Sequence, residues 1–69
     1  MKLVANQLTQ QHYGSKVTFG IPVKRGQSMH TLTLGHVHYE GGEWVLIGAK
    51  GAGAWDRYRV KATSIVEVR

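Results

Sequence analysis

Cysteine is absent from this sequence of 69 residues, which also holds only one proline and four acidic residues. Without cysteine, neither a disulfide nor a thiolate zinc site braces the fold, so a hydrophobic core must hold it together, alone or completed by a partner chain. No apolar run is long enough for a membrane span or a signal-peptide core, which predicts a cytoplasmic protein. The length leaves room for one small domain, which we assign to residues 1–69.

Positive charge, in contrast, is plentiful. Nine Lys and Arg residues outnumber the four Asp and Glu residues and give a net charge of +5. Apolar residues make up 42% of the chain, which excludes the low-hydrophobicity composition of disordered chains. We therefore expect a small folded module whose surface attracts anionic partners.

Alternating apolar and polar side chains predict strands over residues 16–21 and 57–62, each with one buried face. Residues 65–69 predict a short final strand. Pro22 cannot donate a ladder hydrogen bond, so the first strand ends or becomes an edge there, before a loop tip at residues 24–27. Near the N-terminus, Thr9 is suited to cap one helical turn, which Gly14 ends.

The segment from Leu32 to Tyr39 predicts a long bent strand. Leu32 and Leu34 occupy even positions, whereas Val37 and Tyr39 occupy odd ones. A β-bulge at Gly35 would insert one residue and keep all four side chains inside. A strand bent at a glycine is how a small sheet curls toward closure.

Gly41-Gly42 is a strong signal for a two-residue hairpin, because a type I′ turn needs positive φ at both central positions. This register pairs Tyr39 with Trp44 and places Glu40 opposite Glu43. The like-charge pair is unfavourable, so a longer loop with another register stays open.

The order of these elements resembles the small-barrel superfamily of Sm-like and SH3-like domains. The resemblance is carried by residues 17–19, 32–37, 41–42 and 58–68, and it implies an all-β fold, a five-stranded antiparallel barrel with a short N-terminal helical turn. Residues 8–17 resemble the start of small uncharacterised proteins of actinobacterial phages. Sm proteins hold a uridine with an Asp and an Asn after the bent strand, but residues 39–42 contain neither, so no Sm-type RNA pocket is expected.

Basic residues with an aromatic neighbour give the first functional hypothesis, a non-enzymatic nucleic-acid-binding module. Three cations alternate along one predicted strand, three lie on loops, and a tryptophan in the flexible loop is placed to stack on a base. The proposed contacts are Lys24, Arg25, Lys50, Trp55, Arg57, Arg59 and Lys61. The alternatives are that these cations are ordinary solvated residues and that the tryptophan is a lid over the core or an interface anchor.

The second hypothesis is a protein-interaction or assembly module, such as a phage accessory protein. In the favoured hairpin register Val45 and Ile47 point away from the core, so the hairpin is apolar on both faces. A leftover apolar patch usually marks an interface, which Trp55 could extend toward a protein partner or a homo-oligomer.

Catalysis, metals and cofactors find little support in the sequence. The carboxylates are few and unpaired, and the glycine-rich residues 48–54 lack the Lys-Ser/Thr that a phosphate-binding loop needs. His36 and His38 have a spacing that suits a metal, but a catalytic zinc site needs a third ligand. We expect no enzyme, no cofactor, no metal and no small-molecule substrate.

Overall fold

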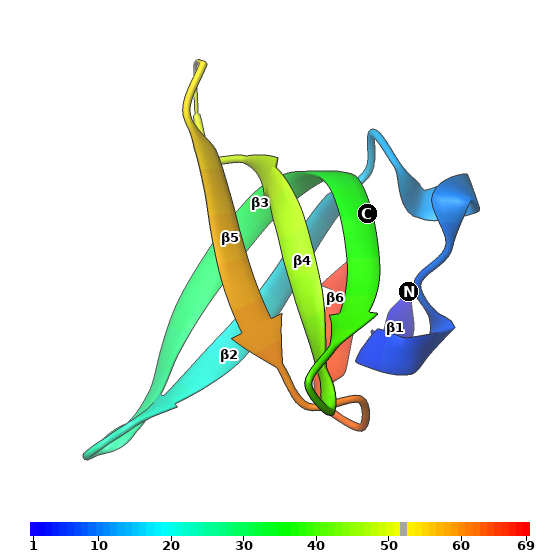
Figure 1. Cartoon of the computed structure of the whole chain (residues 1–69). Helices are drawn as coiled ribbons and strands as arrows, with labels where there is room; N and C mark the ends of the chain where they lie inside the picture. The colour runs from blue at the N-terminus through cyan, green and yellow to red at the C-terminus, as the bar shows by residue number, and fades with distance from the viewer. Residues whose placement is uncertain (52) are drawn as a thin grey trace.

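The computed structural model describes residues 1–51 and 53–69 and is built almost entirely from strands (Figure 1). All pairings are antiparallel, and the six strands form one sheet in the order β1-β6-β2-β3-β4-β5. The strands are β1 (Lys2–Val4), β2 (Lys16–Val23), β3 (Gly26–Glu40), β4 (Glu43–Ala49), β5 (Trp55–Val60) and β6 (Ile65–Val68). Two 3₁₀ turns, η1 (Ala5–Gln7) and η2 (Gln10–His12), follow β1.

The all-β class is confirmed, but the strand number is not five. The additional strand is β1, whose three residues are too few to show an alternating pattern in the sequence. It forms because it pairs with β6, with Leu3 opposite Val66. The sheet curls so that β4 and β5 lie in front of β2 and β6 (Figure 1). It is nevertheless open, since within the described ranges β1 and β5 each pair on one side only, and a closed five-stranded barrel is not confirmed.

The bend in β3 has the predicted origin. Its pairing with β4 shifts register between Leu34 and His36, so Gly35 is the inserted residue of a bulge. Leu34 is buried in the core before the bulge, and Val37 packs partly buried against the core after it. The prediction for Tyr39 was wrong: it lies beyond the end of the core, 63% exposed, and meets the Trp44 ring edge-on.

The predicted hairpin turn is confirmed by its backbone angles, and the predicted helical turn by its cap. Gly41 and Gly42 have φ values of 59° and 87°, and β3 and β4 adopt the expected register with Glu40 opposite Glu43. The longer-loop alternative is therefore excluded. Near the N-terminus, the Thr9 hydroxyl accepts the Gln11 backbone N–H at 3.3 Å and caps η2.

The core lies between the two layers of the curled sheet. Its largest fully buried side chains on this inner side are Phe19, Leu32, Leu34, Leu46, Val17 and Val66. Strand alternation places the even positions of β6, Val66 and Val68, in this core, and it leaves the odd positions of β5 on the outer side of the sheet.

Candidate functional site

The outer side of β5 carries an aromatic residue followed by two guanidinium groups. Trp55, expected in a flexible loop, is instead the first residue of β5 and pairs with Ala49. Trp55, Arg57 and Arg59 are alternate residues of one strand, so they share the outer side. All three are exposed. The predicted alternation is therefore confirmed for Arg57 and Arg59, and Trp55 occupies the preceding position on the same side.

The indole of Trp55 rests on Gly35 of β3. A Cβ atom at Gly35 would lie 2.5 Å from Cζ3 and 2.6 Å from Cη2 of that indole, so only glycine leaves room for the ring. The residue nevertheless stays 65% exposed. The bulge that bends β3 thus also leaves space for the indole, most of which stays exposed to solvent.

An ionic bridge crosses the outer side from β5 to β3. Glu40 Oε1 lies 3.7 Å from Arg59 Nη2, and Glu40 Oε2 lies 3.1 Å from His38 Nε2. The His38 hydrogen bond and the Arg59 charge hold the pKa of Glu40 below its ordinary value. The bridge lies on the outer side of the sheet, where both Glu40 and Arg59 stay largely exposed.

One of the residues predicted for an interface, Val45, has no exposed surface. Val45 stands on β4 between His38 and Arg59 in the register and is fully buried. It therefore cannot contribute an exposed interface in the folded chain. Ile47, next along β4, is half-buried between His36 and Arg57, and of the predicted trio only Trp55 is strongly exposed.

Two imidazoles extend the outer side along β3. The ring centroids of His36 and His38 are 5.3 Å apart. The Tyr13 hydroxyl accepts the Val37 backbone N–H at 3.1 Å and lies 3.3 Å from His36 Nδ1, which orients that ring. Throughout the part of the chain that the structure describes, no group of three or more His, Cys, Asp or Glu residues could hold a metal ion.

The structure does not bring all the predicted basic residues together. Lys61 follows the end of β5, where it lines a small cleft of about 170 Å³ together with Arg59. Lys24 and Arg25 form the tip of the β2–β3 hairpin, which projects away from β5 (Figure 1). Lys50 turns to the inner side and contacts Tyr58 at 3.2 Å. Ala52, in the same predicted loop, lies outside the described residues.

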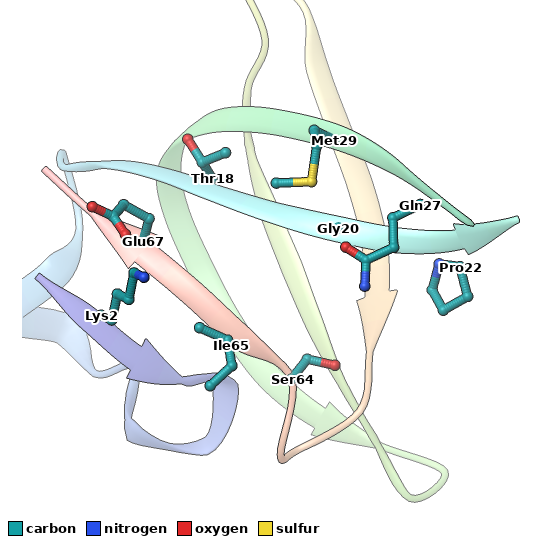
Figure 2. Close-up of a pocket in the computed structure, with 9 residues that line it drawn as sticks. All are labelled: Lys2, Thr18, Gly20, Pro22, Gln27, Met29, Ser64, Ile65 and Glu67. Carbon is teal, nitrogen blue, oxygen red and sulfur yellow. The ribbon is translucent and has the colours of Figure 1, made fainter. Parts of the chain in front are cut away.

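A groove that the sequence did not reveal lies on the outer side of β1, β6, β2 and the first half of β3 (Figure 2). Its volume is about 330 Å³. Gly20 is its floor, with Met29 and Ile65, 61% and 60% exposed, on either side of β2. Lys2 and Glu67 face each other across the β1–β6 register at one end.

The comparisons with known proteins add no relative. No family model, no curated protein and no solved structure matches the chain. Among the described residues there is also no helix with the length and apolar character of a membrane span.

Proposed function

We propose that this protein binds single-stranded nucleic acid, without catalysis, on the outer side of β5. The observation that carries the proposal is the exposed Trp55 indole seated on Gly35, with Arg57 and Arg59 following at alternate positions of the same strand. Proteins that bind single strands combine aromatic stacking platforms with cations that track the backbone.

The spacing of the three side chains supports this role. Alternate residues of a strand are about 6.6 Å apart, so Trp55 and Arg59 lie about 13 Å apart along β5. A base stacks on the indole, and the phosphates that follow it meet the two guanidinium groups. Lys61 follows the end of the strand and lines a cleft together with Arg59, where it adds positive charge near the site.

The proposal favours a single strand over a duplex, because an exposed ring stacks on a base only when that base is free of its duplex neighbours. Stacking and charge neutralisation are tolerant of sequence, so we expect low sequence specificity. The net charge of +5 adds non-specific attraction to any polyanion.

The test is a salt-dependent fluorescence titration. In a Trp44→Phe background Trp55 is the sole tryptophan, and a thymidine oligonucleotide should quench it at about 50 mM salt. Two phosphate contacts predict a slope of about −1.4 for log K against log salt, since single strands release about 0.7 counterion per contact. A duplex of equal length should bind more weakly. Absence of binding at the lowest salt contradicts the proposal.

A protein partner is the second candidate, and the free edge of β5 favours it. Within the described ranges β5 pairs only with β4, so its other edge is open to an added strand, and Arg57 and Arg59 favour an acidic one. A pull-down with and without nuclease separates the candidates. A nuclease-resistant protein partner supports an interaction module, whereas loss on digestion supports nucleic-acid binding.

We also propose that the curled sheet is a small barrel of the SH3-like or Sm-like type. Supporting it are the glycine bend of β3 and two backbone hydrogen bonds, from Ala5 N to Ser64 O at 2.8 Å and from Asn6 N to Ala62 O at 3.0 Å. These bonds join the chain after β1 to the turn after β5. The likeness to phage proteins and the cytoplasmic location stay predictions from the sequence.

A further inference from the structure

A second cationic site lies on the inner side of β5, where Lys50 turns away from the outer side. Its Nζ atom is 3.2 Å from His30 Nδ1 and 3.2 Å from the Tyr58 hydroxyl oxygen. The loop that carries Lys50 is closed by a backbone hydrogen bond of 2.8 Å from Lys50 N to Ala54 O. The ammonium group is therefore held at a defined position.

The hydrogen bonds around Lys50 leave two donors free. An ammonium group has three N–H donors and no acceptor, so His30 Nδ1 and the Tyr58 oxygen both accept from it. One Lys50 N–H remains. Because the Tyr58 oxygen accepts, its own O–H is available to donate as well. Two adjacent donors, one of them charged, are thus not used by the hydrogen bonds within this cluster.

The rings around these donors are fixed by packing. Tyr58 meets Phe19 edge-on, with centroids 5.4 Å apart, and stacks on His30 at 4.6 Å. Phe19 is only 1% exposed and anchors both rings to the core. The two donors therefore need little reorganisation to bind a ligand.

No carboxylate among the described residues forms an ion pair with Lys50. Across residues 1–51 and 53–69, both ion pairs involve Glu40, on the outer side, and neither reaches Lys50. Lys50 itself is exposed. A positioned ammonium beside a hydroxyl donor, open to solvent and free of a carboxylate, favours an oxyanion.

We propose that Lys50 and Tyr58 form a phosphate-binding site, with His30 positioning the ammonium group. The ligand class is a phosphate group, whether free, terminal or part of a nucleic-acid backbone. Phosphate is favoured over carboxylate because its larger negative charge attracts the ammonium group more strongly and it has more acceptor oxygens for the two donors. This site does not depend on the outer side of β5 binding nucleic acid.

The experiment is an NMR titration that follows the His30 and Tyr58 ring signals with inorganic phosphate as the probe. We expect saturable shifts, which acetate at equal ionic strength does not reproduce. Lys50→Gln should raise the apparent Kd at least about tenfold, because it removes the charged donor. Lys24→Gln, an equally exposed lysine at the hairpin tip, is the matched control and should leave the Kd unchanged.

Tyr58→Phe is the second variant, because it keeps the ring that packs on Phe19 and removes only the hydroxyl; it should also weaken phosphate binding. Equal shifts with acetate, or an unchanged Kd in folded Lys50→Gln, overturn the proposal. A thymidine oligonucleotide with and without a 5′-phosphate distinguishes the sources. Preference for the phosphorylated form at this site identifies a terminal phosphate, and equal binding that Lys50→Gln abolishes identifies the backbone. Quenching of Trp55 in the same samples reports separately on the outer side.

Discussion

The outer side of the sheet carries two regions of different character, and β3 contributes to both. Beyond the bend, Trp55, Arg57 and Arg59 combine an exposed ring with cations. Before the bend, the groove of Figure 2 has two exposed apolar side chains, Met29 and Ile65, and its one lysine faces its one glutamate. The difference shows that charge, rather than exposed apolar area alone, distinguishes the candidate site.

The boundary between the two regions is the bulge at Gly35. Odd residues of β3, such as Met29, face outward before it, and even residues, such as His38, face outward after it. One inserted residue therefore keeps the core side continuous while the outer side changes its chemistry. Gly35 also leaves space for the Trp55 indole, so both the bend of β3 and the position of Trp55 depend on this glycine.

The largest effect on binding is expected from reversing the charge of the region that contains Trp55, Arg57 and Arg59. Arg57→Glu combined with Arg59→Glu should weaken oligonucleotide binding at least about 100-fold at low salt, because two phosphate contacts become repulsions. Fluorescence anisotropy with a labelled oligonucleotide measures this. Lys2→Glu, in the neutral groove, is the control and should change affinity less than about threefold. Equal losses in both variants would mean that only net charge matters.

The second prediction compares two exposed aromatic side chains, Trp55 and Tyr39. Trp55→Ala should weaken binding about 5- to 150-fold, the usual range for losing one stacked base. Trp55→Phe should retain part of the affinity. Tyr39 is 63% exposed, close to the 65% of Trp55, but it aligns with Trp44 and Val60 on the opposite side of the sheet from the arginines. Tyr39→Ala should therefore leave the affinity unchanged in the same assay. A similar loss from Tyr39→Ala contradicts the proposed location.

A smaller and more specific effect is expected from Gly35→Ala. The backbone of Gly35 does not have a positive φ, so alanine is tolerated there, but its Cβ displaces the Trp55 ring. The affinity should fall, by less than in Trp55→Ala, with both arginines intact. In the Trp44→Phe background the Trp55 emission should shift to the red as the ring leaves its seat. An unshifted spectrum with full affinity would show that the seat is irrelevant.

The smallest effect concerns Glu40, the acidic residue within the basic region. Glu40→Gln should strengthen oligonucleotide binding by no more than about fivefold, because exposed ion pairs are weak and its loss releases Arg59. The control is Glu67→Gln, in the groove, which should have a smaller effect. Weaker binding of Glu40→Gln would mean that the bridge positions Arg59 for its ligand.

The same residue predicts a pH dependence of stability. The pKa of Glu40 is lowered from 4.5 in the folded chain, so its stabilising contribution is present above that value and is lost as the pH falls through the folded pKa. The difference in unfolding free energy between the parent chain and Glu40→Gln should therefore shrink below about pH 4.5. Urea unfolding at several pH values measures it. A difference that grows with acid contradicts the assignment.

Local rules predicted much of the fold. The parity change around Gly35 and the positive φ of Gly41 and Gly42 depend on neighbouring residues alone, so the bulge and the hairpin register followed from the sequence. β1 was missed because its three residues form a strand only when β6, from the other end of the chain, lies beside them. The way in which the sheet curls equally depends on strands that are far apart in the sequence, such as β1 and β6.

The candidate site was predictable only in part, for the same reason. Alternation along β5 placed Arg57 and Arg59 together. Val45 lies between His38 of β3 and Arg59 of β5 in the register, and the alternation along β4 alone did not reveal that it is fully buried there. The direction of Lys50 was set by Tyr58 and His30, which lie on two different strands, so a loop position alone could not assign it to a side.

The pairing of β1 with β6 has a consequence for the order in which the chain folds. β2 to β5 are joined by hairpins between neighbours in sequence, whereas the hydrogen bond from the Met1 ammonium to Val68 O spans 67 positions. Closing so long a loop costs more conformational entropy than closing a hairpin. We therefore expect β1 to dock after β2, β3, β4 and β5 have paired. Opening of this pair is then the least costly departure from the native state. In native-state hydrogen exchange, the β1 amides should exchange before those between β3 and β4.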